Sequence, residues 1–221
     1  MILSNKELGD LEVDKVIFAV GRKPASEDLF DPKLGIELED QGFVKVNEFC
    51  QTDVQNIYAI GDLVRGPMLA HKASEEGIMV AERIAGKNFS INYKNIPFVI
   101  YTHPEIAWAG YSEKSALKKD IKVEVGTFPF QANGRALTSN EGSGFVKVVV
   151  NHEDDSIIGV LGLGPSAADV VQQGLIAMES NLTSEQLGSI MFSHPTVSEA
   201  LHEAVLSSKG KAIHLNNRKR K

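Results

Sequence analysis

The sequence of 221 residues contains a single cysteine, Cys50. One thiol cannot form an intrachain disulfide, run dithiol redox chemistry alone or build a thiolate zinc site, so the chain by itself is excluded from these classes. With no second cysteine to pair with, Cys50 is assigned no redox role. Scarce cysteine is typical of a reducing compartment, and we expect a bacterial cytoplasm or a mitochondrial matrix.

Long apolar runs and an excess of positive charge are also absent. No run approaches the roughly 20 apolar residues of a membrane-spanning helix, and the first residues lack the pattern of a secretory signal. The net charge of −6 and the pI near 5.6 argue against nucleic acid, because phosphate binding needs a clustered positive field. We interpret the one basic cluster, in residues 216–221, as a solvated tail. We therefore expect neither a membrane nor a nucleic acid as partner.

Short apolar segments closed by glycine dominate the N-terminal part. Residues 13–20 predict a strand buried on both faces of an α/β sheet, and residues 56–60 predict a second one that ends at Gly61. Only a dozen residues precede the first strand, so we expect the rest of its sheet to lie in sequence upstream of this chain. Two more elements are expected here: a short strand at 42–46 and a helix at 68–85 that stops at Gly86.

The C-terminal part has the pattern of an α+β domain that begins near Asn95. Residues 144–150 and 156–163 are two apolar, β-branched runs joined by a polar turn, which predicts a β-hairpin and therefore an antiparallel central sheet. Further strands are expected at 98–101, 107–110 and 122–128, and helices at 112–119, 166–179, 183–188 and 196–207.

A histidine and a glutamate near the C-terminal end form the first candidate site. His194 lies beside a helix-start signal, and Glu199 follows one turn later. An imidazole oriented by a carboxylate is a general base that can also act as an acid. Thr196 and Glu199 also have the spacing of a capping box, which explains the glutamate better on local pattern alone. Both interpretations hold if the carboxylate turns toward the imidazole.

The second candidate site follows the strand predicted at 56–60. Asp62 would emerge at the carboxyl edge of a parallel sheet, where ligands of open α/β folds bind, although a turn or N-cap aspartate is an alternative. Met68, Leu69 and Ala70 open the next helix, whose free N–H groups and positive dipole end suit an electron-rich ring such as a flavin. His71 either borders that ligand or caps the loop.

Other motifs predict no chemistry. We interpret His103-Pro104-Glu105 as a turn between strands, with either X–Pro isomer open at Pro104 and at Pro195. The histidines lack metal-ligand spacing with acidic partners, so no metal site is expected. The glycines at 159, 162 and 164 fall on a hairpin strand, which is the wrong context for a dinucleotide loop.

Five motifs together resemble the flavin-dependent disulfide reductases in order and spacing, over about residues 13–215. They are Ala19-Val-Gly-Arg-Lys-Pro24, Tyr58-Ala-Ile-Gly-Asp62, Met68-Leu-Ala-His-Lys-Ala73, Tyr101-Thr-His-Pro-Glu105 and His194-Pro-Thr-Val-Ser-Glu199. Within that family, the stretches at 66–73 and 101–108 are most similar to the dihydrolipoamide dehydrogenases.

The resemblance implies a role for each candidate residue. Asp62 would bind the ribityl chain of FAD, Met68 to His71 (with Leu69 and Ala70 between them) would border the flavin, and Gly21 would lie in the NAD cleft. His194 with Glu199 would serve the opposite subunit of a homodimer, where the imidazole deprotonates dihydrolipoamide so that its thiolate attacks a redox disulfide. The implied partners are the lipoyl domains of 2-oxo acid dehydrogenase complexes.

The resemblance also implies an organisation in parts. Residues 1–22 would end the NAD-binding domain, 23–96 would be the C-terminal part of the FAD-binding domain, 97–215 the interface domain and 216–221 a basic tail. The family's Gly-x-Gly-x-x-Gly fingerprints and its Cys-x4-Cys pair are not found in this sequence, so we expect them upstream and expect the isolated chain to be inactive. Phe192, where lipoamide enzymes often have histidine, would tune the pocket.

Two alternatives remain open. The chain could be a truncated, non-catalytic module that dimerises or binds a partner. It could also serve a related disulfide reductase with another substrate, such as glutathione or mercuric ion, although the lipoamide-like stretch around Trp108 weighs against this.

Overall fold

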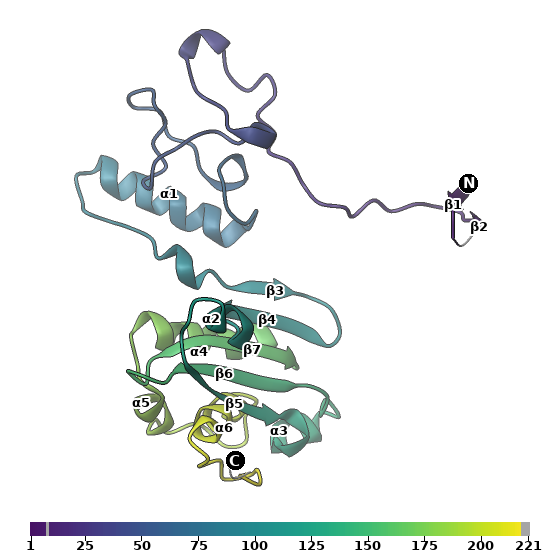
Figure 1. The fold of residues 1–221 in the computed structure, drawn as a ribbon, viewed down its shortest axis with the longest axis vertical. Helices are drawn as coiled ribbons and strands as arrows, with labels where there is room; N and C mark the ends of the chain where they lie inside the picture. The colour runs from purple at the N-terminus through teal and green to yellow at the C-terminus, as the bar shows by residue number, and fades with distance from the viewer. Residues whose placement is uncertain (8, 218–221) are drawn as a thin grey trace. The chain divides into compact units, whose positions relative to one another are not determined.

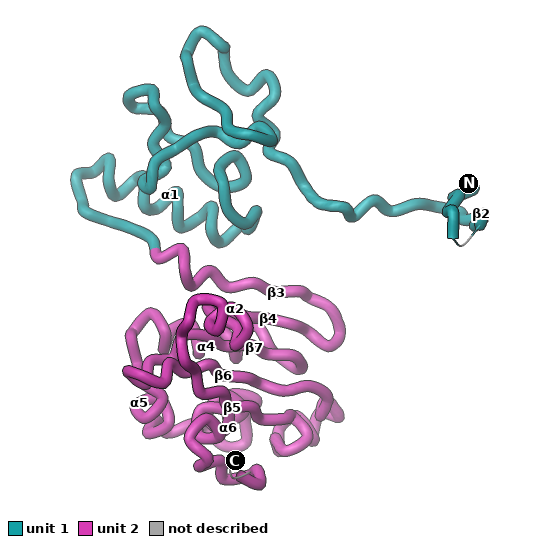
Figure 2. Tube along the Cα trace, in the orientation of Figure 1, with its two compact units in different colours: residues 1–91 teal, residues 92–221 magenta. Residues whose placement is uncertain are grey.

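The computed structural model describes residues 1–7 and 9–217. They form two compact units, Met1–Ile91 and Asn92–Lys221 (Figure 2). The domain boundary predicted from the sequence lies a few residues after this division. Of the predicted basic tail 216–221, residues 218–221 lie outside the described residues.

The C-terminal unit is built on a five-stranded antiparallel sheet. Its strand order is β3-β4-β7-β6-β5, which Figure 1 shows from β3 at the top to β5 at the bottom. The predicted hairpin forms between β6 and β7, with Val148 opposite Val160. The antiparallel α+β architecture is therefore confirmed. The strand bounds are Phe98–Ile100 (β3), Glu105–Gly110 (β4), Val123–Pro129 (β5), Phe145–Asn151 (β6) and Ile157–Gly164 (β7).

Two longer helices pack on this sheet. Helix α4 contacts β4 and β7, and helix α6 contacts β5 and β6. The other helices of the unit are short, and α3 was not expected, because five residues are too few to show helical periodicity. The helix bounds are Glu113–Leu117 (α2), Gly134–Thr138 (α3), Ala167–Glu179 (α4), Ser184–Gly188 (α5) and Glu199–Ser208 (α6), and Tyr93–Asn95 forms a 3-10 turn (η4).

The core of this unit follows the period of two along strand β6. Val146, Val148 and Val150 are fully buried, and they belong to the same cluster as Leu201 and Val205 of helix α6. Each valine taken fully out of water contributes about 1.5–3 kcal/mol, so this face of the sheet holds α6 firmly. The first residue of that helix is Glu199, and the core therefore fixes one candidate site residue.

Substitution of Gly126 tests this close packing. A Cβ built on Gly126 of β5 would lie 1.8 Å from the carbonyl oxygen of Ala204. We expect Gly126→Ala to destabilise the unit by about 1–3 kcal/mol through overpacking, measured by chemical denaturation with Trp108 fluorescence. Gly134→Ala is the matched control, because nothing lies within 4 Å of a Cβ there; an equal loss in both variants would contradict the explanation.

The N-terminal unit contains little regular structure. Strands β1 (Ile2–Asn5) and β2 (Gly9–Glu12) pair with each other, and helix α1 spans Ala70–Ile84. The predicted helix at 68–85 is thus confirmed, and Gly86 follows it at φ 86°. A small cluster of Val44, Ala59 and Val64 forms the core. Three 3-10 turns complete the unit, at Pro32–Leu34 (η1), Asp40–Gly42 (η2) and Gly61–Leu63 (η3).

The buried strand predicted at 13–20 is wrong for the described structure. These residues form no strand with any other described segment, and Ile17, Phe18 and Val20 are 83–93% exposed. A β-strand needs a partner for its backbone groups, and an apolar sequence alone does not supply one. The strands predicted at 42–46 and 56–60 are reduced to single bridges, Leu38 with Val44 and Gln51 with Tyr58. Within the described ranges, no helix is both long and apolar enough to cross a membrane.

Candidate active site

His194 projects from the loop that leads into helix α6. Its side chain is 74% exposed, and its Nδ1 lies 2.8 Å from Oε1 of Glu199. An ionised carboxylate can only accept a hydrogen bond, so Nδ1 carries the hydrogen when Glu199 is charged. Nε2 is then the basic nitrogen, and it is free to take a proton from a ligand. The structure therefore brings the two predicted catalytic residues together.

The second oxygen of Glu199 holds the backbone of the same loop. Oε2 accepts a hydrogen bond of 2.7 Å from the backbone N–H of Thr196. The Thr196 hydroxyl donates instead to the carbonyl of Ser193, at 2.8 Å, and so does not cap the helix. Helix α6 begins at Glu199, and the start predicted at 196 with Thr196 as N-cap is wrong, because this turn uses the threonine locally. Glu199 nevertheless makes both contacts that the sequence left as alternatives.

These contacts favour the charged form of Glu199. Partial burial alone would raise the pKa of Glu199. Hydrogen bonds from the Thr196 N–H and the His194 ring lower it. The charges of His194 and His214 lower it further, so the pKa of Glu199 lies below its ordinary value. A carboxylate that stays ionised fixes the imidazole tautomer over a wide pH range. The dyad is thus arranged as an oriented base.

Removal of this carboxylate has an expected pH dependence. We expect Glu199→Ala to destabilise the C-terminal unit by about 1–2 kcal/mol at neutral pH, since it removes two hydrogen bonds to a charged group. Because the folded-state pKa is lowered, this stabilisation is complete above the ordinary glutamate value of 4.5 and disappears as the pH falls through the folded-state pKa. Denaturation of both proteins from pH 7 to 3 measures it, and a difference that does not decrease as the pH falls below 4.5 would contradict the assignment.

Two polar side chains from distant elements support the loop. Asn133 Nδ2 donates to the carbonyl of Thr196 at 3.0 Å, and Gln173 Nε2 of α4 donates to the hydroxyl of Ser198 at 2.9 Å. Sequence reasoning missed both residues, and only the N-cap pattern at Asn133 gave any signal. Phe192 stacks on His202 with ring centroids 4.8 Å apart. The loop is therefore held by side-chain contacts on several sides of His194.

The Gly61-Asp62 turn of the N-terminal unit is held by a buried ion pair. Lys72 Nζ and Glu76 Oε1 lie 2.8 Å apart with both side chains 2% exposed. Glu76 Oε2 accepts from the Gly61 N–H at 2.7 Å, and Lys72 donates to the Gly61 carbonyl at 3.3 Å. Gly61 has φ 68°, and a Cβ on it would lie 3.0 Å from Cβ of Ala73. The sequence analysis did not predict this pair. Its i,i+4 spacing places Lys72 and Glu76 on the same face of helix α1 as the buried Met79, and this pattern could have indicated a buried pair.

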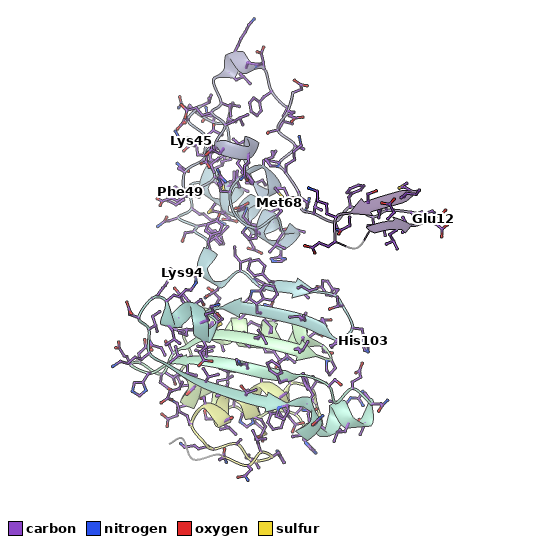
Figure 3. The ribbon with its side chains drawn as sticks, turned by 45° about the vertical axis from the view of Figure 1, so that its right-hand side comes forward. Glu12, Lys45, Phe49, Met68, Lys94 and His103 are labelled. Carbon is purple, nitrogen blue, oxygen red and sulfur yellow. The ribbon has the colours of Figure 1, made fainter. Side chains whose placement is uncertain are left out.

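Arg22 brings two of the predicted cofactor-binding segments together. It forms an ion pair with Asp62 and donates to the carbonyl of Met68 at 3.4 Å. The neighbouring Gly21 is exposed at φ 126°. Figure 3 labels Met68, which precedes helix α1. Arg22 lies in the motif at residues 19–24, but the sequence predicts no separate role for it.

The start of helix α1 fits an electronegative ligand atom. Among the described residues, no side chain caps the helix at its N-cap residue, Leu69. The first-turn N–H groups of an α-helix have no acceptor within the helix itself, and Ala70 and His71 are both exposed. The Asp62 side chain, 34% exposed, adds an acceptor in the same unit. The residues present are thus suited to the oxygen and nitrogen atoms of a flavin and its ribityl chain.

The remaining motifs have structural positions. His103 lies in the loop between β3 and β4 (Figure 3), and the peptide bonds before Pro104 and Pro195 are both cis. Glu105 Oε1 accepts from the backbone N–H of Ala168 at 2.6 Å, at the start of α4. In the described part of the chain, no group of three or more His, Cys, Asp or Glu residues could hold a metal ion.

Comparison with known families gives two consecutive matches. Residues 96–205 match the dimerisation domain of the pyridine nucleotide-disulphide oxidoreductases, and residues 1–77 match a second pyridine nucleotide-disulphide oxidoreductase domain. Together, the two matched ranges take in both candidate sites.

Curated relatives and solved structures point the same way. The dihydrolipoyl dehydrogenases of Cupriavidus necator and Bacillus subtilis are 44% and 42% identical to the chain over 89% and 93% of its length. The mitochondrial enzyme of Caenorhabditis elegans is 44% identical over 92%. The chain spans 41–44% of these three proteins. The HOCl-induced flavoprotein disulfide reductase RclA of Escherichia coli has a similar structure, with a TM-score of 0.83 and 25% identity over 90% of this chain and 46% of RclA.

Proposed function

Because the chain belongs to the pyridine nucleotide-disulphide oxidoreductase family, we propose that it supplies the catalytic base and the dimer surface of a dihydrolipoamide dehydrogenase. One observation carries the proposal: the His194 imidazole is hydrogen-bonded through Nδ1 to Glu199 and exposes its other nitrogen. Relatives whose printed name is dihydrolipoyl dehydrogenase, more than 40% identical, support lipoamide as the substrate.

In the proposed reaction, the residues of this chain move a proton. Nε2 of His194 takes the proton from a thiol of dihydrolipoamide, and Glu199 stabilises the imidazolium that results. The thiolate then attacks a cysteine disulfide outside this chain, which forms a mixed disulfide and releases the other cysteine as a thiolate. The cysteine thiolate released first takes the proton of the second substrate thiol, whose sulfur then attacks the mixed disulfide, closes oxidised lipoamide and releases the second cysteine as a thiolate. His194 returns its proton to that second cysteine thiolate.

The proposed cofactors are FAD and NAD. Asp62 would bind the ribityl hydroxyls, the helix start from Met68 to His71 would border the flavin, and Gly21 would lie by NAD. When bound, the flavin supplies two-electron chemistry that connects the thiols to NAD. Within this chain, Arg22 would keep Asp62 in place, because it is paired with that carboxylate and with the Met68 carbonyl.

We also propose that the C-terminal unit forms a homodimer. The match of residues 96–205 to a dimerisation domain supports it. Apolar side chains near His194 add support: Met191 is 95% exposed and Ile190 47%. A second copy that covers them would set each His194 against its partner's substrate. Lipoyl domains of 2-oxo acid dehydrogenase complexes are the proposed partners, in a bacterial cytoplasm or a mitochondrial matrix.

The native protein tests the proposal directly. An antibody raised against this chain would be used to isolate the protein from its source, and its mass, its visible spectrum and its NAD-dependent oxidation of dihydrolipoamide would be measured. We expect a flavin spectrum, activity and a mass of roughly twice that of this chain. A colourless protein of this chain's mass would instead support the alternative, a non-catalytic dimerisation module. A coloured protein that reduces glutathione disulfide or mercuric ion but not lipoamide would support the other alternative.

A further inference from the structure

Glu203, one turn after Glu199 on helix α6, forms a second histidine–glutamate pair with a histidine that lies beyond the helix. Nδ1 of His214 lies 2.8 Å from Oε1 of Glu203, the same distance as between His194 and Glu199. Glu203 follows Glu199 by four residues on the helix, so the two carboxylates lie on one face. Two like charges at this spacing repel each other, and an imidazole beside each carboxylate offsets that repulsion.

Glu203 is built into the fold far more deeply than a surface glutamate. Its side chain is 4% exposed, and its Oε2 accepts from the backbone N–H groups of Ile213 and His214, at 2.9 and 3.3 Å. The buried carboxylate thus has three hydrogen-bond partners, the two backbone N–H groups and the His214 ring. Glu203 therefore fixes the backbone that carries His214.

The chain after α6 returns along the helix to reach this position. Gly210, at φ 68°, follows the last turn, and Leu215 packs against the core cluster that includes α6. Asn217 accepts from the Ala212 N–H at 3.0 Å and donates to its carbonyl at 2.8 Å, which closes the segment into a compact turn. The position of the His214 imidazole is thus set by contacts on both sides.

The groups that act on Glu199 come from two segments. The Thr196 N–H and the His194 ring belong to the preceding loop, and His214 belongs to the returning segment. The charge of His214 also favours the ionised form of the Glu199 carboxylate. On α6 itself, His202 bonds to the Gly188 carbonyl at 2.9 Å and stacks on Phe192.

We propose that Glu203 and His214 are positioning residues that set the proton affinity of the Glu199–His194 dyad. They touch neither substrate nor cofactor, and they act through Glu199. Their role in turnover rests on the proposed function, but their effect on His194 does not require that function.

The two partners must shift His194 in opposite directions. The His214 imidazolium repels a proton on His194, so its removal raises the His194 pKa. The Glu203 carboxylate attracts that proton, so its removal lowers the His194 pKa. A loosened loop would shift His194 in the same direction in both variants. Opposite signs therefore separate electrostatic coupling from a purely structural role.

The test is a titration of the histidine ring protons by NMR in the 221-residue chain. We expect His214→Gln, whose amide can still donate to Glu203, to raise the pKa of His194 by about 0.3 unit, and Glu203→Gln to lower it by about as much, as for partly screened charges in a watery medium. Both shifts should shrink at high salt. The control is His152→Gln, which removes the imidazole 3.1 Å from Glu124 and should leave His194 unchanged.

Each outcome decides the proposal. Shifts of opposite sign that weaken in salt support it. Shifts of the same sign, or no shift in His214→Gln, overturn the proposal. The His214 ring is 61% exposed, so we expect His214→Gln to stay folded and to be measurable even if Glu203→Gln unfolds. Because the readout is the titration of His194 and not turnover, a result here stands even if the native protein does not oxidise lipoamide.

Discussion

The native protein carrying His194→Gln is expected to lose dihydrolipoamide oxidation by about 10²–10⁴-fold while its flavin stays bound. General base catalysis contributes a factor of this size, and glutamine has no basic nitrogen at neutral pH. The amide can still donate to Glu199, so the loop and the start of α6 should be unchanged. The loss should fall on the steps that need a thiolate, and the measurement is steady-state turnover with the flavin spectrum recorded in parallel.

His152→Gln is the matched control for this substitution. His152 also pairs with a glutamate and is 59% exposed, but it lies in the turn between β6 and β7. Its replacement should leave turnover at the wild-type level. Full activity in His194→Gln would remove this residue from the mechanism, and equal losses in both variants would indicate a general effect on folding.

The antiparallel sheet could be predicted because its signals are local. The β6–β7 hairpin alternates buried and less buried residues on both sides of a polar turn, and each strand finds its partner a few residues away. Helix α1 likewise had its stop signal at Gly86. Short-range pairing and periodicity are visible in a sequence, whereas the pairing of β4 with β7, which joins Glu105 to Gly164, is long-range and has no such local signal.

The segment 13–20 shows where this reasoning fails. Its apolar, β-branched residues have the composition of a buried strand, yet Val20 is 93% exposed and the segment has no described strand partner. The composition of a segment indicates that it would be stable as a strand within a sheet. It does not indicate whether neighbouring strands are present to pair with it. The segment 56–60 differs, because Tyr58 has a bridge partner in Gln51 but the pairing does not extend into a strand.

The candidate site was partly predictable for a related reason. His194 and Glu199 are five residues apart, so local geometry brings them together. Glu203 and His214 are eleven residues apart, and they meet only because the chain reverses after α6. Asn133 reaches Thr196 from 63 residues away, and nothing in the sequence marks that contact. Supporting contacts are therefore the part of a site that sequence patterns reveal least.

The second large effect is expected at the buried pair below the Gly61-Asp62 turn. Glu76→Ala should destabilise the N-terminal unit by about 3–5 kcal/mol, because it leaves the Lys72 ammonium buried without a counter-charge. It also removes the acceptor of the Gly61 N–H. The core of this unit is small, so a loss of this size should unfold much of it.

The single tryptophan allows the two units to be read separately. Trp108 lies in β4 of the C-terminal unit, so its fluorescence reports that unit. Hydrogen exchange of peptides that cover Gly61 and helix α1 reports the other. We expect faster exchange in the N-terminal unit of Glu76→Ala and an unchanged Trp108 transition. Glu27→Ala is the control, because Lys23 and Glu27 form an i,i+4 pair that is 73% and 82% exposed, and its loss should not be measurable.

The double variant Lys72→Met with Glu76→Leu separates charge from position. Replacing both partners by apolar side chains removes the unpaired charge, so most of the lost stability should return. The Gly61 N–H would still lack its acceptor, and the Gly61-Asp62 turn should exchange faster than in the wild type. If the double variant is as unstable as Glu76→Ala, the pair stabilises the unit through its shape and hydrogen bonds. If stability returns while the turn stays mobile, the buried charges serve to hold Asp62 in place, and the fold itself does not depend on them.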